Sequence, residues 1–190
     1  MTGVDGLPGS VDEAVAAERA GRRVKYLFFW GHSGGLRPSC LSQWWPVRFS
    51  EGGREFASAE HYMMAHKAWL FGDDDTAERV LAAGHPGEAK ELGRGVRGFD
   101  DRVWVERRFE IVVRGSVLKF GQHDELREYL LETGNRVLVE ASPVDRVWGI
   151  GLAADDERAG SPRRWRGLNL LGFALMAARQ ELAARGTGLR

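Results

Sequence analysis

Residues 58–72 read Ser-Ala-Glu-His-Tyr-Met-Met-Ala-His-Lys-Ala-Trp-Leu-Phe-Gly and form the most regular stretch of the chain. Ser58 is a residue type that caps helix N-termini and Gly72 one that follows helix ends, so the pattern predicts a helix to about Phe71. Seven residues separate Glu60 from Lys67. At ~100° per residue the two side chains lie within about 20° of one face, roughly 10 Å apart along the axis. This acid and base belong either to a catalytic or binding site or to a solvent-exposed helix face.

Further helices are expected on the C-terminal side of this stretch. Their predicted ranges are Asp74–Ala83, Pro86 to about Gly93, Asp101–Phe120, Asp124–Thr133, and a last helix that Asn169 caps and Gly186 ends. Composition leaves Asp101–Phe120 ambiguous because Val and Ile are frequent. Periodicity favours a helix, because apolar or small residues recur at steps of three and four: Val105, Phe109, Val112, Ser116 and Phe120.

The expected strands are short. The aromatic run Tyr26–Trp30 and the segment Val137–Glu140 read as strands, and Gly52-Gly53 separates two arms of a hairpin. Gly31–Ser42 reads as a turn-rich loop. Residues 1–22 are expected to be an N-terminal tail and residues 23–186 one domain. The fold class is therefore α+β, a predominantly helical single domain with a small antiparallel sheet.

Composition excludes several classes of function. The chain has 190 residues, of which 43% are hydrophobic, with 27 basic and 27 acidic side chains. A balanced charge argues against general nucleic-acid binding. Cys40 is the only cysteine, no stretch approaches the ~18 apolar residues of a membrane span, and the acidic N-terminus lacks a signal pattern. These features predict a cytoplasmic protein that does not bind membranes.

Several catalytic and metal-binding motifs are missing. His61 and His66 are five residues apart and do not form the metal-binding pair at i and i+4, and no paired cysteines occur. Neither a phosphate-binding P-loop nor a serine nucleophile elbow is found. We therefore expect neither a metal nor a cofactor.

Aromatic and basic residues leave two interpretations open. Tryptophans near polar or Gly-rich elements can stack on a base or pack in the core: Trp44, Trp45, Trp104, Trp148 and Trp165. Arg94, Arg97 and Arg146 can hold a phosphate or belong to a solvated face.

Taken in order, the residues resemble the YbiA-like NADAR (NAD- and ADP-ribose-associated) family over about residues 26–184. The matching segments are Phe28-Phe29-Trp30, Leu41-Ser42-Gln43-Trp44, Glu60-His61-Tyr62 with Lys67, Gly93-Arg94, Trp104, Lys119-Phe120, Val139-Glu140, Asp145 with Trp148-Gly149, and Asn169-x-Leu171-Gly172-x-x-Leu175-Met176-x-x-Arg179. Some members have an acid two residues after the motif tryptophan, where this chain has Ile150.

This resemblance implies a YbiA-like fold and hydrolysis of an N-glycosidic bond. It implies Glu60, Lys67 and Asp145 as catalytic residues. The substrate-binding residues that it implies are Phe29, Trp30, Gly31, Ser42, Gln43, His61, Arg94, Trp104, Trp148, Gly149 and Asn169. Family substrates are phosphorylated ribosylamino-pyrimidines of riboflavin synthesis, or ADP-ribosylated guanine.

In both kinds of substrate ribose C1 carries an exocyclic amine. Lys67 can attack the opened imine while Glu60 moves protons. Alternatively, Asp145 or Glu60 activates a water against the sugar. Two readings of other classes stay open: a non-catalytic module that binds ADP-ribose or NAD derivatives, and a structural interaction protein.

Overall fold

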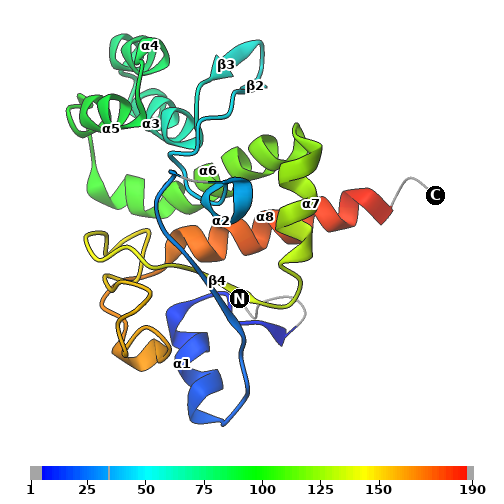
Figure 1. Ribbon diagram of the computed structural model, residues 1–190. Helices are drawn as coiled ribbons and strands as arrows, with labels where there is room; N and C mark the ends of the chain where they lie inside the picture. The colour runs from blue at the N-terminus through cyan, green and yellow to red at the C-terminus, as the bar shows by residue number, and fades with distance from the viewer. Residues whose placement is uncertain (1–5, 34, 188–190) are drawn as a thin grey trace.

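The computed structural model describes residues 6–33 and 35–187, for the last two of which only the backbone is described. The fold is mostly helical with two small sheets, which confirms the predicted class (Figure 1). Its elements are α1 (Val11–Arg19), β1 (Tyr26–Phe29), α2 (Leu36–Ser39), β2 (Phe49–Glu51), β3 (Arg54–Phe56), α3 (Ala59–Leu70), α4 (Asp74–Ala82), α5 (Pro86–Arg94), α6 (Asp101–Gly121), α7 (Asp124–Glu132), β4 (Val137–Glu140), the 3₁₀ turn η2 (Pro162–Arg164) and α8 (Leu170–Thr187).

Helix boundaries follow the residues that can satisfy free backbone donors. The Ser58 hydroxyl accepts from His61 N at the start of α3, and the Asp73 carboxylate accepts from Thr76 N at the start of α4. Pro86 occupies the first turn of α5, where its missing N–H costs nothing. The helical reading of residues 101–120 is confirmed by α6.

Long helices α6 and α8 pack together at the centre of the molecule. Above them in Figure 1 lie α3, α4, α5 and the β2–β3 hairpin; below them lie β1, β4, α1 and the loop that follows β4. The main core joins the upper and central layers, and a second apolar cluster around Val137, Val139, Ile150 and Phe173 lies below. The loop that follows β4 brings Asp145 close enough to α3 for its charge to act on Glu60.

The two sheets have different directions. β2 and β3 form the expected antiparallel hairpin, whereas β1 and β4 pair in parallel, with Tyr26 opposite Val137 and Phe29 opposite Glu140. The sequence predicted only an antiparallel sheet. More than one hundred residues connect β1 to β4, and such a crossover allows parallel pairing that a hairpin turn does not.

Near both ends of the described chain, helical structure extends beyond the predicted elements. Within the expected tail, α1 buries Ala14 and Ala17 and packs against η2, where the Ser161 hydroxyl donates to Glu18 at 2.6 Å. At the other end α8 continues through Gly186, the expected stop, to Thr187. Among the described residues no helix is long and apolar enough to cross a membrane.

Candidate active site

Three carboxylates meet where β4 approaches α3. Glu60 lies in the first turn of α3, Glu140 is the last residue of β4, and Asp145 lies in the loop that follows. Each of the two glutamates feels the charge of Asp145, and Glu140 also feels that of Glu60. Residues separated by eighty positions in sequence thus form one acidic cluster.

Glu60 is a buried acid. Its side chain is 3% exposed, and its Oε1 atom has no hydrogen-bond partner among the described residues. Burial raises the pKa of Glu60 to about 7, opposed by the positive charge of Lys90 and by a hydrogen bond from the Trp44 side chain. A carboxyl group that is half-ionised near neutral pH can both accept and donate a proton.

Glu140 has a similar environment. Its Oε2 atom is buried and lacks a partner within the described part of the chain. Burial raises the pKa of Glu140 to about 8, and the negative charges of Asp145 and Glu60 add to the effect. Unsatisfied buried carboxylate oxygens are costly, and they are typical of sites that a ligand or water completes.

The loop after β4 fixes Asp145 through its own backbone. The Asp145 Oδ1 atom accepts from the N–H groups of Val147 and Trp148, both at 2.8 Å. Gly149 lies so close to the Glu140 carbonyl that a Cβ atom there would be 2.8 Å from that oxygen. Gly149 therefore acts by allowing close approach, and half-buried Trp148 packs against the main core.

Aromatic and basic side chains form a wall on one side of the acidic cluster. The Trp44 ring lies 5.5 Å from the ring of His32 and 5.6 Å from that of His85, and Lys90 Nζ lies 6.0 Å from the Trp44 ring. Lys90 and Arg94 are four residues apart on α5, and the positive charge of each lowers the pKa of Glu60. Such a wall is suited to a planar ring and an anionic group.

Lys67 lies two turns along α3 from Glu60, in a separate aromatic environment. Its Nζ atom donates to the Gly93 carbonyl oxygen at 2.7 Å and lies 4.2 Å from the Phe99 ring and 5.6 Å from the Trp104 ring. Burial lowers the pKa of Lys67, partly offset by the charge of Asp101. The structure therefore brings Lys67 together with Trp104 but gives it no direct contact with the carboxylates.

Some of the predicted binding residues hold the backbone of the site. The Gln43 carbonyl oxygen accepts from Glu60 N at 3.0 Å, and the Ser42 hydroxyl accepts from Trp44 N at 3.1 Å. The Asn169 side chain bonds the backbone of Leu138 and Glu140, both at 2.9 Å. Asn169 thus supports β4 with its side chain, and it directly precedes α8, where its backbone carbonyl accepts from Phe173 N at 3.2 Å.

Other predicted binding residues have different surroundings. Both ring nitrogens of buried His61 are engaged, Nδ1 with the Ser58 hydroxyl at 2.8 Å and Nε2 with the Ala83 carbonyl at 3.0 Å. Phe29 lies in the main core and Trp30 is 58% exposed, while Gly31 turns the chain at a φ of 79°. Of the arginines that could hold a phosphate, Arg97 bonds Asp73 at 2.6 Å.

Ile150 occupies the position where some family members have an acid. It is fully buried in the second apolar cluster with the β4 residues Val137 and Val139. Its backbone N–H donates to the Glu140 carbonyl at 2.9 Å. In this chain the position therefore supports β4 by packing.

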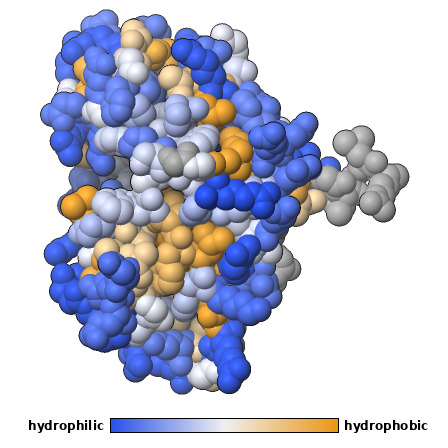
Figure 2. All heavy atoms as spheres, in the orientation of Figure 1, coloured by the Kyte–Doolittle hydropathy of each residue, from blue (hydrophilic) through white to orange (hydrophobic). Residues whose placement is uncertain are grey.

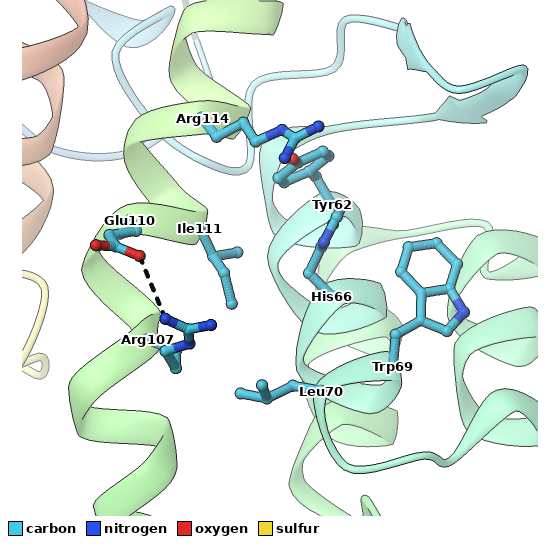
Figure 3. A pocket seen from close by; sticks show the side chains of 8 residues that line it. All are labelled: Tyr62, His66, Trp69, Leu70, Arg107, Glu110, Ile111 and Arg114. Atoms are coloured by element: carbon cyan, nitrogen blue, oxygen red, sulfur yellow. Dashed lines mark ion pairs between the residues drawn. The ribbon is translucent and has the colours of Figure 1, made fainter.

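The surface is hollowed at one edge, between the half that carries α5 and the half that carries the loop after β4 (Figure 2). A different pocket of about 440 Å³ lies between α3 and α6 (Figure 3). Its residues Tyr62 and His66 lie about 200° and 240° around α3 from Glu60, so it opens on the opposite face of that helix. Its arginines are already paired, Arg107 with Glu110 and Arg114 with Glu51.

Three residues of the cluster are not among the predicted site residues. Glu140 and Trp44 stand within the family-like segments, as the last letters of Val139-Glu140 and of Leu41-Ser42-Gln43-Trp44, but the sequence assigns Glu140 no role and leaves Trp44 open between stacking on a base and core packing. Lys90 gives no signal, because a lysine on a charged helix is usually solvated. Among the described residues no group of three or more His, Cys, Asp or Glu side chains is placed to hold a metal ion.

Residues 28–183 match the model of the NADAR domain family. The chain belongs to this family. The resemblance seen in the sequence is thereby confirmed, and so is the prediction of an enzyme, at the level of a hydrolase of N-glycosyl compounds.

Comparison with known NADAR relatives agrees with this assignment. N-glycosidase R617 of Acanthamoeba polyphaga mimivirus is 46% identical over 165 residues, 83% of this chain and 96% of that protein. The riboflavin biosynthesis protein PYRR of Zea mays is 35% identical over 134 residues, which cover 66% of this chain and 19% of the maize protein. The NMR structure of Escherichia coli YbiA superposes with a TM-score of 0.67 at 25% identity, over 92% of this chain and 95% of that one.

Proposed function

We propose that this NADAR protein hydrolyses the bond between ribose C1 and an exocyclic amine, in a phosphorylated ribosylamino-pyrimidine. The observation that carries the proposal is the pair of buried carboxyl groups with unpartnered oxygens, Glu60 and Glu140, beside Asp145. The maize relative is named a riboflavin biosynthesis protein, which supports a pyrimidine intermediate of that kind.

Proton transfer is the first requirement of this reaction. Breaking the C1–N bond releases an amine, which must gain a proton, while the incoming water must lose one. Because the pKa values of Glu60 and Glu140 lie at about 7 and about 8, one group can be ionised while the other is protonated near neutral pH. We assign Glu60 as the base and the protonated Glu140 as the acid.

Lys67 supplies the proposed nucleophile. The glycosylamine opens to an imine, and the neutral amine of Lys67 adds to C1. The exocyclic nitrogen takes a proton and leaves, so that a Schiff base joins Lys67 to the sugar. Water then adds to C1 and releases the sugar and the free lysine. Burial favours the neutral amine, because it lowers the pKa of Lys67.

This route requires Lys67 and the carboxylates to reach one ligand. Lys67 lies on the same helix as Glu60, and its bond to the Gly93 carbonyl places it against α5, which also carries Lys90. A ribose with its attached ring extends over such a distance, since two turns of helix rise roughly 11 Å. The competing route uses water that Asp145 or Glu60 activates directly, with Lys67 as a fixed positive charge.

Lys90 and Arg94 are assigned to the substrate phosphate. They extend from adjacent turns of α5 toward Glu60, whereas Arg97 is held by Asp73 and Asp75. Arg94 pairs with Glu91 at 2.7 Å, but both side chains are exposed, and such a pair exchanges readily for a phosphate. We assign Trp44, with His32 and His85, to the leaving ring.

A chromatographic comparison of substrates tests the proposal. Purified protein is incubated separately with a ribosylamino-pyrimidine phosphate and with ADP-ribosylated guanosine, and the released base is measured. We expect faster release from the pyrimidine compound and loss of release in Glu60→Gln. Cleavage of the guanosine compound alone would assign the chain to removal of ADP-ribose, and tight binding of ADP-ribose without cleavage would indicate a non-catalytic module.

A further inference from the structure

Lys119 is a buried lysine in the last turn of α6. Its side chain is 1% exposed, and its Nζ atom donates to the carbonyl oxygens of Cys40 at 2.6 Å and of Ser42 at 2.8 Å. Burying an ammonium group is costly unless its donors are paired. Here the pairing ties α6 to a segment almost eighty residues earlier in the chain.

The held segment, residues 40–44, leads directly to Glu60. The Ser42 hydroxyl accepts from Trp44 N, which fixes the backbone of Trp44. The Gln43 carbonyl accepts from Glu60 N, and the Trp44 side chain, as a donor toward the Glu60 carboxyl group, opposes the rise that burial causes in its pKa. Two links to Glu60 therefore start within two residues of the carbonyl groups that Lys119 holds.

We infer that Lys119 is a positioning residue for Glu60, acting through the segment Cys40–Trp44. Lys119 does not touch the carboxylates itself, because its donors are directed at two backbone oxygens. It fixes the place from which Trp44 donates to Glu60. The effect on turnover rests on the proposed function, whereas the effect on Glu60 itself does not.

Two other roles for Lys119 fit the contacts less well. A nucleophile must reach the substrate, and a side chain that is 1% exposed with its Nζ atom bonded to two carbonyls does not. A thiolate partner for the ammonium is also absent at neutral pH, since burial raises the pKa of Cys40 to about 11. The backbone carbonyls are thus the groups on which Lys119 acts.

The test follows the Glu60 carboxyl group directly, by carbon-13 NMR of protein labelled in its glutamate carboxyl groups, with Glu60→Gln to assign the signal. Activity alone would mix two titrations, because burial also lowers the pKa of Lys119 to about 7. Lys119→Met should raise the midpoint of the Glu60 titration by on the order of one pH unit, since a hydrogen bond to the charged form is lost. Trp44→Phe removes the same bond and should give a similar shift.

The double variant Lys119→Met with Trp44→Phe should shift the midpoint no further than Trp44→Phe alone, because both changes act on one bond. Val117→Ala, also buried in α6, is the matched control for lost packing and should leave the midpoint unchanged. Lys119→Gln keeps donors for the carbonyl groups, so it should restore most of the wild-type titration and remains usable if Lys119→Met does not fold.

An unchanged Glu60 midpoint in folded Lys119→Met, with the thermal stability lowered as in Val117→Ala, would show a purely structural lysine. If only Lys119→Gln folds, Trp44→Phe decides the test: an unchanged Glu60 midpoint in that variant would overturn the inference, because the held segment would then not act on the carboxyl group.

Turnover provides the second measurement. In Lys119→Met, kcat at pH 7 should fall about fivefold and recover as the pH rises, with KM little changed, because less Glu60 is ionised at pH 7. Wild-type protein without glycosidase activity would refute the proposed function and leave the NMR titration as the test of positioning. A normal titration with a reduced kcat at every pH would overturn the positioning role.

Discussion

Asn169 and Glu140 are joined side chain to backbone: the Glu140 N–H donates to Asn169 Oδ1 at 2.9 Å, while Asn169 Nδ2 donates to the Leu138 carbonyl oxygen, also at 2.9 Å. The amide of Asn169 thus takes the place of a neighbouring strand along the end of β4. Asn169 itself adopts a φ of 51°, which asparagine tolerates better than most residues. The position of Glu140 depends on this contact.

Replacing Asn169 should therefore affect both stability and catalysis. Asn169→Ala removes two buried hydrogen bonds and places alanine in a left-handed conformation, so we expect a loss of roughly 2–4 kcal/mol in the free energy of unfolding. Chemical denaturation measures this change. Leu168→Ala, at an exposed neighbouring position, should cost less than about 1 kcal/mol. Similar losses for the two variants would contradict the role of Asn169.

Glu60→Gln should lower kcat by about 10²-fold or more, the usual scale for a proton-transfer group. In the wild type, the ionised base increases as the pH rises through the pKa of about 7, so kcat should rise over the same range. Steady-state rates between pH 5 and 9 measure this limb. Glu55→Gln, at an exposed position in β3, should change neither kcat nor its pH dependence. Unaltered turnover in Glu60→Gln would remove Glu60 from the mechanism.

The contribution of Glu60 and Glu140 to folding stability should fall as the pH rises from about 4.5 to about 8. The pKa values of Glu60 and Glu140 are raised in the folded protein from 4.5 to about 7 and about 8, so within this range these two groups bind more protons in the folded state than in the unfolded state. Glu140→Gln removes its share of this dependence. Its stability relative to the wild type should therefore increase with pH, as urea denaturation at pH 5, 6.5 and 8 can show. A constant difference across these three pH values would argue against a raised pKa for Glu140.

Lys67→Arg should be as damaging as Lys67→Ala if Lys67 forms a Schiff base, because arginine keeps the charge but does not replace the amine as a nucleophile. Treatment with borohydride during turnover should trap the sugar on the wild-type protein, and mass spectrometry should find the added mass. Lys90→Ala keeps Lys67 and should still give the adduct, with a higher KM. An active Lys67→Arg enzyme and no trapped adduct would instead support direct attack by water.

Much of the fold could be predicted from local patterns in the sequence. Ser58, Asp73 and Pro86 mark helix starts because capping and proline geometry depend on a few adjacent residues. The three- and four-residue spacing through α6 outweighed its content of β-branched residues, because burial of one helix face depends on periodicity. The motif residues also indicated the family, because their types and their order along the chain are a property of the sequence.

Parallel pairing of β1 with β4 was missed because strand direction depends on how a long connection crosses the fold. The contacts of the Asn169 side chain with β4 were missed for a related reason, because the sequence placed Asn169 before the last helix but did not show that β4 lies beside it. The packing of α1 was missed because this segment has few large apolar residues, yet its small side chains Ala14 and Ala17 are buried against the rest of the domain.

By itself, the sequence determined helices α3 to α8, the acid and base on α3, and the membership of the NADAR family. Only the tertiary structure placed Glu140, Asp145 and Lys90 around Glu60, and Lys119 beneath the segment that contacts it. Helix propensity and capping act over a few residues, so a local pattern records them. The pKa of a carboxyl group depends on burial and on charges brought together from distant parts of the chain, and no local pattern contains that information.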